Sequence, residues 1–129
     1  MKVLLDTHVL LWWLQDSSRL RAPTRALMAD PGSELLWSAA STWELAIKAG
    51  LGKVRLGRPL SQFVTEAIAR QSLTPLPIHH AHAAAVEGLP PLHRDPFDRL
   101  LVAQATVEGV PLLTADPQLT AYGIECVRA

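Results

Sequence analysis

Residues 3–14 read VLLDTHVLLWWL, and this stretch predicts a buried strand followed at once by a helix. The apolar run at 3–5 is typical of a parallel strand covered on both faces, and residues 8–15 predict the helix. Asp6 and His8 interrupt the stretch, which is far shorter than the ~20 residues that a membrane-spanning helix needs. We therefore expect no signal peptide, no membrane association and a cytoplasmic location.

The same alternation of strand and helix patterns continues along the chain. Further strands are expected at residues 35–37, 76–78, 110–114 and 124–127, and helices from Ser17-Ser18 to Met28, at 41–49, from Pro59, at 79–87, at 95–108 and at 117–122. Strands that alternate with helices predict a parallel sheet with helices on both faces. The expected fold class is α/β: a three-layer α/β/α sandwich with a short, mostly parallel central sheet, in one domain of residues 1–129.

The composition excludes several classes of protein. Hydrophobic residues make up 49% of the 129 residues and charged residues 19%, which excludes a disordered chain. Cys126 is the single cysteine, so an intramolecular disulfide framework and a Cys-based zinc site are excluded. Twelve basic and twelve acidic residues cancel overall, but residues 48–70 carry five basic residues against Glu66, a net charge of +4. Such a basic segment suits an enzyme that handles a phosphate backbone.

Acidic residues recur where the expected strands end and the following helices begin. Asp6 directly follows the first strand, Glu44 lies in the helix after the second, and Asp116 follows the fourth. Asp95 and Asp98 lie at the start of another helix. In a parallel sheet these carboxylates meet at one edge, where their mutual repulsion favours a bound cation. Oxygen ligands favour Mg²⁺ or Mn²⁺, and such an ion promotes phosphodiester hydrolysis.

Most of these acids, taken singly, also have a structural interpretation. Ser41-x-x-Glu44 has the pattern of a capping box. The Asp-Pro pairs at 95–96 and 116–117 are typical helix starts, and Asp98 would be a favourable acid in a first helical turn. Asp6 has no comparable structural explanation, so the set as a whole indicates a functional site.

Four segments resemble a known family in order and spacing. They are LLDTHVLLWW (4–13), SAASTWELAIKAGLGKV (38–54), HRDPFDRLLVAQA (93–105) and PLLTAD (111–116). Together they closely resemble PIN-domain nucleases and, within them, the VapC-type toxins of bacterial toxin–antitoxin pairs. The resemblance implies an Mg²⁺- or Mn²⁺-dependent endoribonuclease that acts on RNA, forms a homodimer and is held inactive by a VapB-type antitoxin.

The resemblance also assigns the site residues. The catalytic and metal-binding acids that it implies are Asp6, Glu44, Asp98 and Asp116. Asp98 best matches the third acid, with Asp95 as the cap of its helix, although residues three apart on a helix share a face and either can reach a metal. Thr114 matches a hydroxyl residue often found just before the fourth acid. Whether one ion or two is bound stays open.

Basic residues near the acids are candidates for contacts with RNA. These are Lys48, Arg94 and Arg99; the alternative for the two arginines is surface pairing with Asp95 and Asp98. The histidines at 79–82 lack the spacing of a helical zinc pair and are expected to be structural.

Other histidine and tryptophan side chains are weaker candidates for functional contacts. His8 is expected to pack in the core, whereas His93 lies near the third acid and is a minor candidate for substrate contact. Of the adjacent Trp12 and Trp13, one is expected to be available to a partner, and Trp43 is another candidate for such a surface.

Other functions are weighed on the same residues. A haloacid-dehalogenase-like phosphatase needs a second Asp two residues after the first, where this sequence has His8. A receiver domain needs a Lys after a late strand, and none lies near Thr114. Two alternatives remain open: a PIN-like binding module with little catalysis, and an RNA-processing nuclease that is not a toxin.

Overall fold

The computed structural model describes all 129 residues. Its elements are β1 (Lys2–Leu5), α1 (Thr7–Leu14), α2 (Ala22–Ala29), β2 (Glu34–Ser38), α3 (Ala39–Gly50), α4 (Leu60–Arg70), β3 (Thr74–Leu76), α5 (His80–Ala85), the 3-10 helix η1 (Val86–Gly88), α6 (Pro96–Glu108), β4 (Leu112–Thr114), the 3-10 helix η2 (Pro117–Tyr122) and β5 (Cys126–Arg128). None of the helices combines the length and the apolar character needed to cross a membrane.

The five strands form one sheet in the order β3-β2-β1-β4-β5, and every pair in it is parallel. β1 is the central strand: Leu4 lies opposite Leu36 of β2 on one side and opposite Leu112 of β4 on the other. The expected α/β class is confirmed, and the sheet is wholly rather than mostly parallel.

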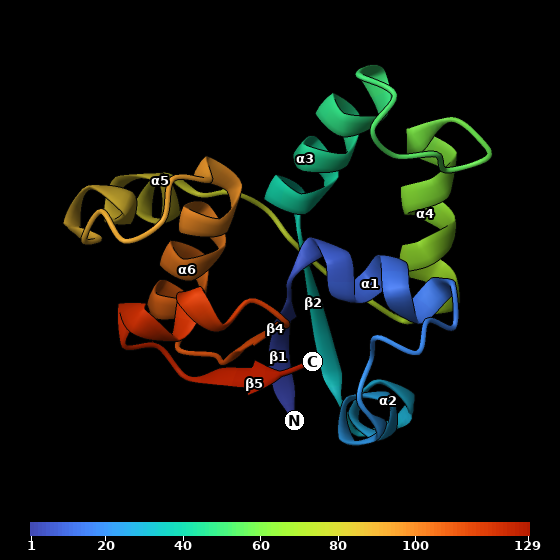
Figure 1. Cartoon of the computed structure of the whole chain (residues 1–129), viewed down its shortest axis with the longest axis horizontal. Coiled ribbons are helices and arrows are strands. Elements are labelled where there is room, and N and C mark those ends of the chain that lie inside the picture. Colours follow the sequence, from blue (N-terminus) through green and yellow to red (C-terminus); the bar gives the residue numbers. More distant parts are fainter.

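Successive residues of each strand enter different hydrophobic cores. Val3 and Leu5 pack in the core that includes Phe63 of α4, whereas Leu4 packs in the core that includes Leu101 of α6. This follows from the alternation of side chains along a strand, which sends neighbours to opposite faces of the sheet. Figure 1 shows α1 and α4 on one side of the sheet and α5 and α6 on the other, as a three-layer sandwich requires.

Several elements differ from their expected bounds. The helix expected after Ser17-Ser18 begins only at Ala22, where a proline in the first turn favours helix initiation. β3 covers 74–76 rather than 76–78, because its pairing ends where Leu76 lies opposite Ser38, the last residue of β2. The last strand begins two residues later than expected, and the helix expected over 79–87 is divided into α5 and η1.

Candidate active site

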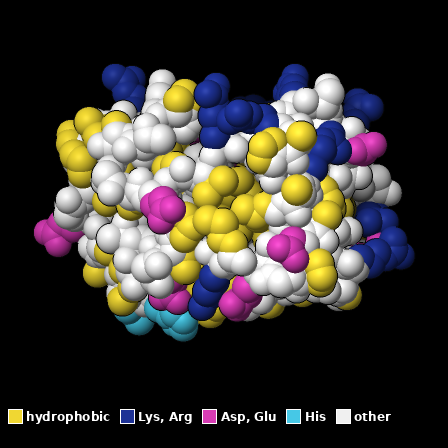
Figure 2. All heavy atoms as spheres, turned by 90° about the horizontal axis from the view of Figure 1, so that it is seen from below, with side chains coloured by type: hydrophobic (Ala, Val, Ile, Leu, Met, Phe, Trp, Pro, Cys, Tyr) yellow, Lys and Arg dark blue, Asp and Glu magenta, His cyan; other side chains and the backbone are white.

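The carboxyl ends of the strands bring the acidic segments of the sequence to one edge of the sheet. Asp6 follows β1, Asp116 follows β4 as the N-cap of η2, and Glu44 lies in α3, which leaves β2. The opposite face, seen from below Figure 1, shows acidic side chains that lie apart from one another (Figure 2). The acids that follow the strands therefore gather at the carboxyl edge, as the parallel topology predicts.

Asp6 and Asp116 are linked through Thr114. The buried Thr114 Oγ1 donates a hydrogen bond to Asp6 Oδ2 at 2.7 Å and accepts the backbone N–H of Asp116 at 3.0 Å. Asp6 is only 6% exposed and makes no side-chain capping bond to α1. Burial raises the pKa of Asp6, and Glu44 adds to the rise, while the Thr114 hydrogen bond and His8 oppose it. Among side chains, Thr114 is the one that hydrogen-bonds this carboxylate, and it thereby orients it.

Glu44 lies within α3 and does not cap it. The helix begins at Ala39 because Ser38 Oγ accepts the N–H of Ala40 at 2.9 Å, so the capping box expected at Ser41-x-x-Glu44 is wrong. The Glu44 side chain is 2% exposed, with Oε2 at 2.5 Å from Lys48 Nζ and Oε1 without any hydrogen-bond partner. An unpartnered buried carboxylate oxygen is costly, and here it lies within a cluster of acids.

Lys48 is the cation that faces this cluster. Burial lowers the pKa of Lys48, but the hydrogen bond and charge of Glu44, with the charges of Asp95 and Asp98, outweigh this and raise the pKa overall. Its ammonium group is held by Glu44, one helical turn before it, so the expected RNA contact would have to share this group with the site.

Asp95 and Asp98, the two candidates for the third acid, have different surroundings. Asp95 Oδ1 accepts the N–H groups of Phe97 at 2.8 Å and Asp98 at 3.2 Å, so Asp95 is the N-cap of α6 as predicted. Burial first, and then the charges of Asp6, Asp95 and Glu44, raise the pKa of Asp98 to about 7 against the opposing effect of His93. The carboxylate of Asp98 is thus one whose charged form needs a cation.

His93 lies in the site, although from the sequence it was only a minor candidate for substrate contact. Its Nε2 lies 3.1 Å from Asp116 Oδ2 and 3.4 Å from Asp98 Oδ2, and its Nδ1 accepts the N–H of Asp95 at 3.0 Å. The ligand atoms of His93, Asp98 and Asp116 all lie within 4.8 Å of one another, whereas Asp6 and Glu44 lie outside this group. The signal in the sequence was a histidine two residues before the Asp-Pro helix start.

A second missed feature joins α1 to α3 beside these acids. Thr7 Oγ1 donates to Ser41 Oγ at 2.8 Å, and both side chains are buried. Thr7 directly follows Asp6, and Ser41 lies three residues before Glu44, on the same helix face. This contact joins α1, which directly follows Asp6, to α3, which carries Glu44.

The other candidate residues have different surroundings. Arg99 donates to the carbonyl oxygen of Pro90 at 2.9 Å and faces those of Val86 and Leu89. Of its two alternatives, pairing with Asp95 and Asp98 is therefore wrong. Arg94 is exposed and makes no ion pair.

The structure places the other aromatic candidates as follows. His82 is buried, accepts the His79 N–H and contacts Glu108, so its role is structural. His8 is exposed, so core packing was wrong for it. Trp12 and Trp13 are both half-buried, and Trp43 is 55% exposed with its ring edge-on to Phe97 at 4.9 Å.

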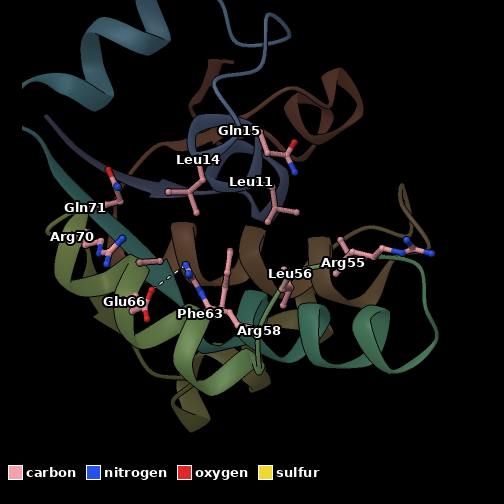
Figure 3. A pocket seen from close by; sticks show the side chains of 12 residues that line it. Leu11, Leu14, Gln15, Arg55, Leu56, Arg58, Phe63, Glu66, Arg70 and Gln71 are labelled. Carbon is pink, nitrogen blue, oxygen red and sulfur yellow. Dashed lines mark ion pairs between the residues drawn. The ribbon is translucent and has the colours of Figure 1, made fainter.

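Two cavities flank α1. One, of about 400 Å³, adjoins the acids and is lined by Thr7, Trp12, Lys48 and Lys53 among others. The other, of about 360 Å³, lies between α1 and α4. Figure 3 shows that Leu11, Leu14 and Phe63 point into this second cavity, while Arg55, Arg58 and Arg70 surround it and Arg58 pairs with Glu66 at 3.1 Å.

Comparison with known proteins agrees with this architecture. The family model described as PIN domain matches residues 3–125. Ribonuclease VapC22 of Mycobacterium tuberculosis is 34% identical over 125 residues, which cover 93% of this chain and 91% of that protein. Ribonuclease VapC16 of the same organism is 41% identical over 61 residues, and this match spans 47% of the chain but only 43% of that protein.

A solved structure shares the fold at low identity. A chain in the crystal structure of VapBC2 from Rickettsia felis, bound to a DNA fragment from its promoter, matches with a TM-score of 0.73 and 14% identity, over 99% of this chain and 98% of that one. The family match covers nearly all of the sequence and the VapC22 identity extends over the same length. This chain belongs to the PIN domain family.

Proposed function

We propose that this chain, as a single domain of residues 1–129, is a divalent-metal-dependent endoribonuclease and the toxin of a toxin–antitoxin pair. The site consists of Asp6, Glu44, Asp98 and Asp116, with Thr114 and Asp95 in support. Its relatives VapC16 and VapC22 are named ribonucleases. A cytoplasmic location, where the chain would meet RNA, is part of the proposal.

The observation that carries this proposal is the buried, unpartnered Oε1 of Glu44 beside a carboxylate whose pKa is raised. Burial first, and then Asp6 and Asp95, bring the pKa of Asp98 to about 7. Both features are costs in the protein alone, and a cation between the carboxylates would offset both. The donors are almost all carboxylate oxygens, which favours Mg²⁺ or Mn²⁺ over zinc.

The residues of the chain have distinct tasks in the proposed reaction. A divalent ion bound here would stabilise charge on the scissile phosphate and lower the pKa of a water molecule. Asp6 and Asp98 would hold the ion most directly. Glu44 and Asp116 would complete the set of four acids and orient the attacking water for in-line displacement. Thr114 holds the Asp6 carboxylate in place through their 2.7 Å hydrogen bond.

The cavity beside the acids suits a strand of RNA. Lys48 and Lys53 line it and supply positive charge for phosphates, and Trp12 offers a ring on which a base can stack. Arg94 is exposed at the start of the α6 segment and is a further phosphate contact in this proposal. Arg99 is not part of this surface, because loop carbonyl oxygens occupy its guanidinium group.

The partner surfaces in this proposal are apolar. The cavity between α1 and α4 has apolar walls and three arginines around it (Figure 3), which suits an apolar antitoxin segment that carries acidic residues. Trp43 and Ile47 are exposed one turn apart on α3, and such a face suits a second copy of the chain in a homodimer.

Cleavage of an end-labelled, structured RNA by the purified chain tests the proposal. We expect cleavage with Mn²⁺ or Mg²⁺, none with chelator, and a loss of at least about 100-fold in Asp6→Asn and Asp98→Asn. Asp30→Asn, in the exposed turn before β2, is the matched control and should retain activity. Cleavage that persists in both site variants would overturn the assignment, and metal binding without cleavage would indicate a binding module.

Expression in cells separates a toxin from an RNA-processing enzyme. Induction of the wild-type chain alone is expected to arrest growth, whereas Asp6→Asn at equal abundance is not. Normal growth with a chain that is active on RNA in vitro would favour the processing nuclease.

A further inference from the structure

His93 lies where the two helix starts that carry Asp98 and Asp116 approach each other. It belongs to the loop before α6, and its side chain is only 15% exposed. Asp98 comes from the first turn of α6 and Asp116 is the N-cap of η2. The imidazole Nε2 is within 3.4 Å of one oxygen from each carboxylate. His93 is thus the side chain that contacts both acids at once.

The backbone of Asp95 determines which ring nitrogen carries the proton. The Asp95 N–H lies 3.0 Å from His93 Nδ1, and an amide N–H is always a donor. Nδ1 must therefore accept, which places the proton of the neutral ring on Nε2. A histidine that binds a metal through one nitrogen usually donates from the other, and here the other nitrogen faces a donor. The geometry therefore opposes direct metal ligation by His93.

We propose that His93 is a positioning residue, whose Nε2–H donates to Asp116 Oδ2 while the same nitrogen faces Asp98 Oδ2 at 3.4 Å, so that it holds both carboxylates ready for the divalent ion. This inference rests on the proposed function. Each carboxylate keeps further lone pairs for a cation, because an ionised carboxylate has about four acceptor sites. The Asp95 N–H donates to Nδ1 and so orients the imidazole. The residue that caps α6 therefore also positions His93.

The tautomer can be measured directly in the metal-free wild-type chain. Long-range ¹H–¹⁵N NMR correlations of the imidazole rings, with His93 assigned by its loss in His93→Gln, are expected to show Nε2 protonated. The same pattern is expected to persist after Mg²⁺ is added. An Nε2 without a proton, in either state, would overturn the proposal, since this nitrogen would then be an acceptor or a ligand.

Three substitutions separate the two ring nitrogens. The amide nitrogen of His93→Gln can replace Nε2 as donor, His93→Asn can replace only Nδ1, and His93→Leu replaces neither. We expect Mn²⁺ affinity, measured by electron paramagnetic resonance without RNA, to fall about 10- to 100-fold in the Asn and Leu variants and to stay within a few-fold of wild type in Gln. His80→Leu, at an exposed histidine of α5, is the matched control.

The alternative outcomes are distinct. Equal losses in all three variants, wild-type affinity in Leu, or rescue by Asn rather than Gln would each overturn the positioning role. Melting temperatures in chelator within a few degrees of wild type are expected, and a large drop confined to Leu and Asn would make the residue merely structural. If the wild type binds Mn²⁺ but does not cleave RNA, the proposed function fails while the positioning role stands; a wild type that binds no Mn²⁺ overturns both.

Discussion

Thr114 Oγ1 donates a 2.7 Å hydrogen bond to Asp6 Oδ2, and the same oxygen accepts the N–H of Asp116 at 3.0 Å. One hydroxyl group therefore joins the acid at the end of β1 to the acid after β4. The two residues that share the 2.7 Å bond are 108 positions apart in the sequence. The central position of β1 beside β4 makes this contact possible.

Replacing Thr114 by Val should weaken both the fold and the site. The side chains are similar in shape, but Val leaves the buried Asp6 oxygen and the Asp116 N–H without their partner, a cost of about 1–3 kcal/mol. Thr114→Ser keeps the hydroxyl and should lose only about 1 kcal/mol from one buried methyl group. Urea unfolding in chelator and RNA cleavage with Mn²⁺ measure the two effects. Equal stability and activity of the Val and Ser variants would contradict the role of the bond.

The pH dependence of stability follows from Asp98. Burial, and then Asp6 and Asp95, raise the pKa of Asp98 from 3.8 to about 7, so the folded chain binds more protons than the unfolded chain between these values. The contribution to stability is therefore complete below about pH 4 and is lost as pH rises through 7. The expected loss in chelator is on the order of 2–4 kcal/mol.

Unfolding experiments at pH 5 and pH 8, with chelator, test this sign. Asp98→Asn should remove most of the difference in stability between pH 5 and pH 8, and should be more stable than wild type at pH 8. The control Asp30→Asn should keep the difference. Saturating Mn²⁺ should reduce the loss at pH 8 in wild type, because the ion binds the deprotonated carboxylates. A wild type that becomes more stable with rising pH in chelator would contradict the environment described for Asp98.

Removing the charge of Lys48 should expose the cost of burying Glu44. Lys48→Met leaves a carboxylate that is 2% exposed without its cation, whereas the lysine itself is 32% exposed. Breaking a fully buried pair costs 3–5 kcal/mol, so about 1–3 kcal/mol is expected for this partly exposed one. Glu44→Gln in the same chain should restore much of the loss. The urea midpoints of Lys48→Met and of the double variant with Glu44→Gln test this prediction. Lys53→Met, at an exposed lysine, is the control.

Lys53 should contribute to RNA binding and not to the chemical step. Lys53→Ala is expected to raise KM about 3- to 10-fold with kcat unchanged, and to reduce the salt dependence of binding by about one phosphate contact. Lys2→Ala is the matched control. Lys2 is the first residue of β1 and therefore lies at the amino end of the strands, away from the acids at their carboxyl ends. A fall in kcat with an unchanged KM would place Lys53 in the site itself.

Local sequence patterns predicted most of the elements of this protein and the roles of several residues. The apolar run before Asp6 predicted a buried strand, because such runs suit strands covered on both faces. The Asp-Pro pair at 95–96 predicted the start of α6, since an aspartate cap and a proline in the first turn act over two or three residues. The Ser41 pattern predicted the start of a helix at Ser41, but the helix is capped by Ser38. Either serine can cap a helix, and the position where β2 ends determines which one does.

The sequence by itself determined the kind of fold and which acids it would present, because strand and helix signals are local. Only the tertiary structure decided how those acids meet. The strand order places β1 between β2 and β4, and so brings Asp6 to Thr114 and leaves Glu44 buried. The role of His93 also depends on this arrangement, since the α6 and η2 starts that it joins are brought together by packing between distant segments, which no local pattern encodes.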